Sequence, residues 1–373
     1  MGDFVGKTKE IPPIYVFDFE SDPFKEWTEE SEQRIPQVFA VGVLGPEDVY
    51  ESYWGTQVDC ITFLLSCMEA APRGSIFYAH NGGRFDFHFF KKEMRGKLQM
   101  IGARITEAQV GHVYLRDSFS LLPEALKKFP FGDQSKLDID YGLMEPGIRE
   151  NHKEEILAYM KRDCVVLRRG VVAFIEEFGI SLTVASASMR EFKKFHEYER
   201  LSPKQDEEFR QFFYGGRVEC FEKGIIEGDF KVYDVNNMYG SVMRNFEHPI
   251  SQACIAYGGR FKAKAIDDCD FAEIECRQDG AFPTRIENGS LVFNRPDGIF
   301  RVTGHEIRAA LDCNLVHIKQ ILRVYRAAER SKFDTFIDHF HGLRLKAKAE
   351  GNQLGNMFYK LVINSSAPAP TFG

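Results

Sequence analysis

The sequence contains 373 residues, of which 44% are hydrophobic and 28% are charged, and this composition excludes an intrinsically disordered chain. The length predicts two to three domains with a substantial core. The net charge of −7 excludes a chain that is basic throughout, so any contact with a nucleic acid requires a local basic patch.

Strands and helices alternate in the first half of the sequence. Apolar alternation and turn residues predict strands at 14–19, 38–44, 76–80 and 113–117. Helical periodicity predicts helices at 58–70, from about 85 to 92 and at 152–178. This order predicts an α/β domain, to which we assign residues 10–190.

The second half has a mixed pattern. Residues 186–213 are predicted to be helical, and residues 218–235 are rich in strand-forming side chains with turns at Gly224 and Gly228. Short strands are predicted within 253–302, followed by a helix that opens with a capping box at Thr303 and Glu306. A long helix is predicted from 344 to 365, ended by Pro368 and Pro370.

Asp18 and Glu20 form a D-x-E pattern on the first predicted strand. Residues two apart on a strand point to the same face, so the two carboxylates lie side by side. Adjacent buried carboxylates repel each other, and a bound metal ion removes that repulsion. The alternative is an exposed strand end with two solvated acids, and D-x-E patterns alone are common.

A tight turn is predicted at Asn81 to Gly83, directly after the strand at 76–80. Asn and Gly tolerate positive φ and let the backbone approach a ligand closely. Phe85 and Asp86 follow, and they supply an aromatic ring and a third carboxylate. The alternative is an ordinary turn with an acidic residue at the start of a helix.

Tyr159 and Asp163 lie four residues apart in the helix predicted at 152–178, so both face the same side. This arrangement suits a metal-held carboxylate next to a phenol that orients a water molecule. The alternative is a helix with one buried Tyr and one surface Asp.

Together these segments resemble the Exo I, Exo II and Exo III motifs in the proofreading domain of family B DNA polymerases. The patterns D-x-E, N-x-x-x-F-D and Y-x-x-x-D occur here in the family's order. The resemblance implies an RNase H-like 3′–5′ exonuclease domain with a two-metal site for Mg²⁺ or Mn²⁺. It implies metal ligation by Asp18, Glu20, Asp86 and Asp163, positioning of the water by Tyr159, and DNA contacts by Asn81 and Phe85.

Two further segments resemble DNA-binding elements of protein-primed members of that family. Lys136 stands in a K-x-x-h pattern, which in the family helps to hold the primer end. The run from Tyr214 through Gly215 and Gly216 to Arg217 resembles the Y-x-G-G element that holds the template strand, although here Tyr directly precedes the glycines. The alternative for this run is a plain interdomain turn.

Polymerase motifs A and B are also suggested by resemblance. Asp234, Val235 and Tyr239 occupy the positions of motif A, where a strand ends at a metal-binding Asp and a Tyr lies under the incoming sugar. Lys360 and Asn364 match the start of motif B and share one helical face. A Lys there suits a triphosphate as a point charge.

The last residues depart from the family pattern. Ser366 is followed by residues 367–373 without the expected Tyr-Gly, and the Asp-Thr-Asp acids of motif C do not occur. For residues 191–373 we expect an incomplete α+β polymerase palm with an insertion and the start of the fingers, without a thumb. We therefore expect a truncated protein-primed family B DNA polymerase that retains exonuclease chemistry. The alternatives are a free-standing 3′–5′ exonuclease and a non-catalytic module that binds DNA or a terminal protein.

The expected partners follow from the same resemblance. They are single-stranded DNA and primer-template DNA, with dNTPs for the intact polymerase and a terminal (priming) protein. No apolar run reaches membrane-spanning length, and the eight Cys form no C-x-x-C pair, as expected for reduced thiols. We expect a cytoplasmic protein of phage, viral or plasmid origin, with no membrane partner.

Overall fold

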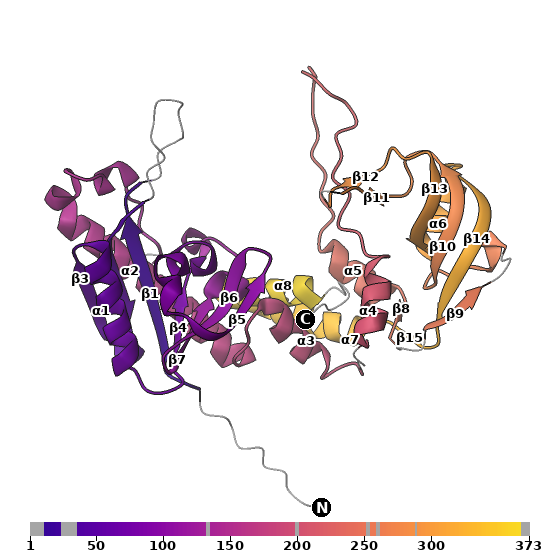
Figure 1. The fold of residues 1–373 in the computed structure, drawn as a ribbon. Helices are drawn as coiled ribbons and strands as arrows, with labels where there is room; N and C mark the ends of the chain where they lie inside the picture. Colours follow the sequence, from indigo (N-terminus) through magenta and orange to yellow (C-terminus); the bar gives the residue numbers. More distant parts are fainter. Residues whose placement is uncertain are drawn as a thin grey trace, which may run out of the picture. The chain divides into compact units, whose positions relative to one another are not determined.

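The computed structural model describes residues 11–23, 36–131, 135–197, 201–250, 254–258, 262–287 and 289–366 (Figure 1). The chain divides into two compact units. The first contains residues 1–189 together with 344–362, and the second contains residues 190–343 together with 363–373. Among the described residues, no helix is both long and apolar enough to cross a membrane.

In the described part of the first unit, seven strands form one mixed sheet in the order β3-β2-β1-β4-β7-β6-β5. β1 pairs with β4 in parallel and with β2 antiparallel, and β4 pairs with β7 in parallel. The strands are β1 (Ile14–Ser21), β2 (Val38–Leu44), β3 (Tyr50–Trp54), β4 (Ile76–Ala79), β5 (Arg95–Ile101), β6 (Arg104–Val110) and β7 (Val113–Asp117).

The side chains of β1 alternate between two environments. Phe17 and Phe19 belong to a buried apolar cluster that also contains Leu64 and Met68 from α1 (Gln57–Ala70). Asp18 and Glu20 therefore project from the opposite face, and α2 (Lys153–Phe178) packs against β1 and β2. The alternation in β1 thus places Phe17 and Phe19 in the apolar layer with α1, and Asp18 and Glu20 on the opposite face.

The sequence accounts for the start of α1 and for the end of α2. Thr56 caps α1 by accepting a hydrogen bond from the backbone N–H of Asp59. α2 ends at Gly179, whose φ of 71° is easily adopted by glycine. The sequence prediction located β1, β2, β4, β7, α1 and α2 but missed β3, β5 and β6. Residues 86–93, predicted to start a helix, form the 3₁₀ segment η3 (Asp86–Glu93), which is interrupted by non-helical backbone at Phe90.

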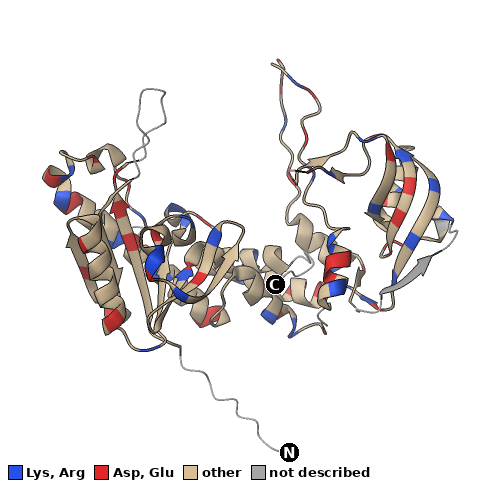
Figure 2. Cartoon of the chain, viewed as in Figure 1, with Lys and Arg blue, Asp and Glu red and all other residues tan. Residues whose placement is uncertain are grey.

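Among the described residues of the second unit, four strands form an antiparallel sheet in the order β13-β10-β14-β9. They are β9 (Cys254–Gly258), β10 (Phe271–Gln278), β13 (Asp297–Thr303) and β14 (Val316–Ala327). α6 (Gly304–Asp312) packs on this sheet, and the predicted capping box at Thr303 and Glu306 is formed. Acidic and basic positions are interspersed across the strands (Figure 2), with cross-strand ion pairs such as Arg301 with Glu273.

The remaining elements are short or connect the larger ones. They are β8 (His248–Pro249), β11 (Thr284–Arg285), β12 (Leu291–Val292), β15 (Arg330–Ser331), α3 (Val184–Phe192), α4 (Pro203–Arg210), α5 (Met238–Asn245), α7 (Asp334–Ala349) and α8 (Gln353–Ser366). The predicted helix at 186–213 is thus two helices. The predicted helix at 344–365 is also interrupted, because Gly351 adopts a φ of 69° between α7 and α8. Pro368 and Pro370 lie outside the described residues.

The strands predicted at 218–235 are absent from the described structure. This segment is extended and exposed, and the side chains of Val218, Ile225 and Val232 are 96–97% accessible. Strand-forming residues adopt a β-strand only where a neighbouring strand completes their backbone hydrogen bonds. Local propensity alone was therefore a poor guide here.

Candidate functional site

The acidic face of β1 carries Asp18 and Glu20. Glu20 is buried and Asp18 is partly buried, and β1 is held between β2 and β4. A strand with neighbours on both sides has little freedom to move its side chains toward solvent. The two carboxylates are thus fixed on one rigid platform under α2.

Asp86 reaches the same region from the start of η3 and is buried. Asn81 adopts a left-handed conformation with φ of 62° and leads into the buried Gly82 and Gly83. A Cβ on Gly83 would overlap the carbonyl oxygen of Ile105, so only glycine fits at this position. The turn predicted from the sequence therefore directs the chain from β4 to Asp86.

The third contribution comes from α2. The side chains of Tyr159 and Asp163 lie one turn apart, and both residues are buried. The ammonium of Lys136 forms an ion pair with the carboxylate of Asp163 and lies 4.5 Å from the centroid of the Tyr159 ring. The hydroxyl of Tyr159 is 3.1 Å from that of Tyr141. Lys136 and Tyr141 thus tie a loop to the acidic face of α2.

The carboxylates influence one another's ionisation. Burial raises the pKa of Asp18 well above its usual value, and the charges of Asp163 and Asp86 raise it further. Burial also raises the pKa of Glu20, as does the charge of Asp18. The ammonium of Lys136 acts in the opposite direction on both. Three segments that are distant in sequence therefore form one electrostatic cluster.

Asp86 shows the same effect. Burial raises its pKa to about 7, against hydrogen bonds from the backbone N–H groups of Asp86 and Phe19. The hydrogen bond from Phe19 links η3 directly to β1. Carboxyl groups that are costly to ionise in this way are stabilised as carboxylates by a bound cation.

The donor set suits Mg²⁺ or Mn²⁺, which prefer oxygen ligands. Glu20 Oε1 and Asp163 Oδ1 are buried and have no hydrogen-bond partner among the described residues, so each has an acceptor available for a cation. Within the same described ranges, no three His, Cys, Asp or Glu side chains already converge as a metal-binding group. Lys136 engages Asp163 on its other oxygen.

Two residues of this region were given no role from the sequence. Tyr141 contacts the Tyr159 hydroxyl, and its place five residues after Lys136 was the available signal. Asp117, at the end of β7, is buried and ion-paired with Arg104. It also accepts a hydrogen bond from the backbone N–H of Gly83, so it holds the turn that precedes Asp86. The sequence gave no sign of this contact.

The predicted DNA-contacting residues of the first unit lie around the carboxylates. Asn81 is half-buried in the turn, and Phe85 is half-buried with its ring 5.0 Å from that of Phe89. Both residues belong to the segment that connects β4 to Asp86. Their contact with DNA stays a prediction.

In the second unit, Arg217 is engaged within the chain. It donates hydrogen bonds to Glu219 and to the carbonyl oxygen of Gly280, and its guanidinium lies 4.0 Å from the centroid of the Phe293 ring. Gly215 and Gly216 are exposed with open space around them, and Tyr214 is half-buried. The run is an exposed segment without regular structure, and the Arg at its end is held by contacts within the chain.

The motif A residues lie in an exposed segment. Asp234 and Val235 are exposed, and the strand that was expected to end at Asp234 is not formed. Asn237 has a φ of 52° and precedes α5, which carries Tyr239, 53% accessible. Lys360 and Asn364 are exposed on α8, one turn apart.

Comparison with known proteins identifies the family. Residues 141–367 match the family described as DNA polymerase type B, organellar and viral. This chain belongs to that family. The resemblance to protein-primed family B polymerases drawn from the motifs is thereby confirmed.

Individual relatives support the assignment. Over 354 residues the chain is 43% identical to the DNA-directed DNA polymerase of Enterobacteria phage PRD1, covering 95% of this chain and 60% of the relative. The structure also matches Phi29 DNA polymerase in an orthorhombic crystal form (TM-score 0.71, 16% identity) and in complex with primer-template DNA (TM-score 0.70, 17% identity). Each match covers 95% of this chain and 67% of the Phi29 chain. The predicted fold class, an α/β RNase H-like domain followed by part of an α+β palm, is confirmed.

Proposed function

We propose that the first compact unit is a 3′–5′ DNA exonuclease. The observation that supports this most strongly is the electrostatic cluster of Asp18, Glu20, Asp86 and Asp163, built from β1, η3 and α2. Two of its buried carboxylate oxygens have no partner among the described residues. Strongly perturbed carboxyl groups gathered in this way are typical of a catalytic site.

Asp18, Glu20, Asp86 and Asp163 would hold the Mg²⁺ or Mn²⁺ ions, which when bound stabilise the charge on the attacking and leaving oxygens. Tyr159, held by the Tyr141 hydroxyl, positions the attacking water. Burial raises the pKa of the Tyr159 phenol, so the phenol keeps its proton at neutral pH and can donate it in a hydrogen bond.

Three other residues of this unit bind the DNA end. Lys136 holds Asp163 in place and presents a positive charge to the phosphate that is cut. Asn81 and Phe85 contact the terminal nucleotide, with the Phe85 ring as a surface for the base. Single-stranded DNA is the proposed substrate.

We further propose that the second unit and α8 belong to the polymerase chemistry of this family. Asp234 and Val235 would contribute to its metal site, Tyr239, Lys360 and Asn364 to the nucleotide site, and Tyr214 to Arg217 to the template path. Primer-template DNA, dNTPs and a terminal protein are the corresponding partners. Because no Asp-Thr-Asp segment occurs in these 373 residues, we expect this chain by itself to add no nucleotides to a primer.

The exonuclease proposal is tested with a 5′-labelled single-stranded oligonucleotide and Mg²⁺. We expect products that shorten from the 3′ end, and loss of all digestion with EDTA or in Asp18→Ala and Glu20→Ala. Thermal unfolding of both variants checks that they fold. Digestion that persists in a folded Asp18→Ala protein contradicts the proposal. DNA binding without digestion by the unaltered chain would instead favour a non-catalytic binding module.

A further inference from the structure

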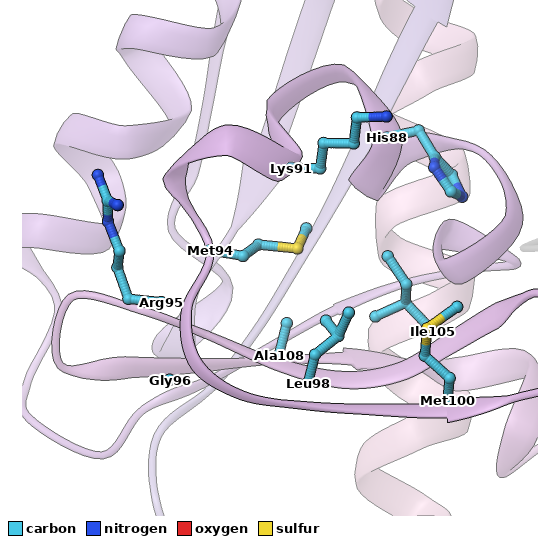
Figure 3. Close-up of a pocket in the computed structure, with 9 residues that line it drawn as sticks. All are labelled: His88, Lys91, Met94, Arg95, Gly96, Leu98, Met100, Ile105 and Ala108. Carbon is cyan, nitrogen blue, oxygen red and sulfur yellow. The ribbon is translucent and has the colours of Figure 1, made fainter.

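The first unit contains a concave feature that borders η3. It is a pocket of about 340 Å³ between η3 and the β5–β6 hairpin (Figure 3). It is lined by His88, Lys91, Met94, Arg95, Gly96, Leu98, Met100, Ile105 and Ala108. Its volume lies within the range of ligand pockets, about 300 to 1,000 Å³.

The pocket exists because β5 bulges away from β6. Arg95 pairs with Gln109 and Gln99 pairs with Glu107, so four steps along β5 oppose two steps along β6. The extra residues include Gly96, whose φ is 76°. β-bulges of this kind bend the strand and often occur beside functional sites.

The floor of the pocket is apolar. Ile105 and Ala108 are buried members of the main apolar cluster, and Leu98 and Ala108 point from the hairpin toward Met94 (Figure 3). Leu98 and Met100 remain 45% and 50% accessible. Large apolar side chains left this open on a concave surface indicate a binding site.

The rim of the pocket is positively charged. Lys91 and Arg95 are among the residues that line the pocket, and no acidic residue is among them. In the part of the chain that the structure describes, neither Lys91 nor Arg95 forms an ion pair, whereas Arg104 is paired with Asp117 and Glu107 with Arg116. Two unpaired cations above an apolar floor match a ligand with both an anionic and an apolar part.

The pocket is close to the proposed catalytic cluster. Asp86 and Lys91 both belong to η3, whose backbone departs from helical geometry at Phe90. Five residues of chain span at most about 18 Å. A stacked DNA strand advances about 3.4 Å per nucleotide, so about five nucleotides are enough to cover this distance. A strand with its 3′ end at the carboxylates is thus long enough to reach Lys91.

We propose that this pocket binds a nucleotide of single-stranded DNA on the 5′ side of the bond that is cut. The base or sugar contacts Leu98 and Met100, and the phosphates contact Lys91 and Arg95. The inference rests on the proposed exonuclease function, because that function supplies a strand that leaves the carboxylates. It assigns the same function, DNA binding, to the bulge in β5 and to the basic residues Lys91 and Arg95.

The charged rim is tested with the double variant Lys91→Ala/Arg95→Ala and the control Lys92→Ala, which removes an exposed Lys that does not line the pocket. Binding of a labelled ten-residue oligo(dT) is measured in EDTA at several salt concentrations. The double variant should bind more weakly and show a salt slope smaller by about 1.4, whereas the control keeps the original slope. The loss of affinity of the double variant, relative to the unaltered chain, should become roughly sevenfold smaller between 50 and 200 mM salt.

The apolar floor is tested with Leu98→Ser and the control Ile101→Ser, an exposed residue of the same strand outside the pocket. Leu98→Ser should weaken binding without changing the salt slope, because no phosphate contact is lost. Ile101→Ser should bind like the unaltered chain. Equal losses in both variants would place the effect outside the pocket.

Digestion of the dinucleotide d(TT) separates the two proposals. This substrate has no phosphate besides the one that is cut, so it offers none for Lys91 and Arg95 to contact, and the double variant should digest it at the normal rate. If the unaltered chain digests neither d(TT) nor the ten-residue oligonucleotide, the exonuclease proposal is wrong, while the binding assays in EDTA still report on the pocket. Binding of the ten-residue oligonucleotide that is unchanged in the double variant and in Leu98→Ser overturns the pocket proposal.

Discussion

Asp18 and Asp234 both match metal-binding positions of sequence motifs, but the fold gives them opposite surroundings. Asp18 lies on a strand flanked by β2 and β4, where burial and neighbouring carboxylates raise its pKa. Asp234 lies in an exposed segment without a strand. A carboxyl group acquires unusual chemistry only where the structure removes water and brings charges together. The comparison shows that a sequence motif identifies the residue, and that burial and neighbouring charges in the fold determine its pKa.

The sharpest test of this comparison exchanges each acid for its neutral amide. Asp18→Asn should reduce digestion at least about a hundredfold, in line with the loss of one essential charge-stabilising group. It should also raise the melting temperature of the metal-free protein, because a repelling buried charge is removed. Asp234→Asn should leave the melting temperature unchanged. Equal changes of melting temperature in Asp18→Asn and Asp234→Asn would contradict the difference between the surroundings of the two acids.

The two Gly-Gly pairs, Gly82-Gly83 and Gly215-Gly216, provide a second comparison. Gly83→Ala should destabilise the protein by about 3 kcal/mol, because the new methyl group overlaps the Ile105 carbonyl. Gly216→Ala meets no atom within 4 Å and should change stability by less than about 0.5 kcal/mol. Urea unfolding of the two variants measures the difference. Similar values would show that the turn before Asp86 is less tightly packed than the structure indicates.

The pH dependence of stability tests the buried cluster. The pKa of Asp86 is raised from 3.8 to about 7, so as pH rises the unfolded chain releases this proton first. The wild type should therefore lose stability relative to Asp86→Asn from about pH 4 to about pH 7, with no further loss above. Urea unfolding in EDTA at several pH values checks this. A difference that stays constant across that range contradicts the assigned burial.

The smallest expected effect concerns Arg217. Its loss should weaken single-strand binding and reduce the salt slope by about 0.7, the contribution of one phosphate contact. Because Arg217 is also held by Glu219 and Gly280, Glu219→Gln serves as the control for the local structure. An unchanged salt slope in Arg217→Ala would favour the alternative interpretation, in which this segment is a plain interdomain turn.

The sequence was most informative where its patterns are local. The period of two in β1 and the helical spacing of Tyr159 and Asp163 specified which faces carry the carboxylates. The Asn81 turn was recognisable because few residues tolerate its backbone conformation. These features follow from short-range geometry, and the structure contains each of them.

Other features depend on partners that are distant in sequence. The contact of Asp117 with Gly83 joins the end of β7 to the turn that follows β4, and no local pattern records it. The β5 bulge depends on its register with β6, which a single strand cannot reveal. The predicted strands at 218–235 failed for the same reason, since a strand requires a neighbour.

The exposed segment at 218–235 has a consequence for handling the protein. Its backbone N–H and C=O groups and its β-branched side chains are open to solvent, so it resembles an unprotected sheet edge that can recruit another extended chain. Charged residues interrupt the apolar ones along it, among them Glu222, Lys223, Glu227 and Lys231. Such residues act as gatekeepers against fibril-like association, so we expect their replacement by apolar residues to promote aggregation of this chain.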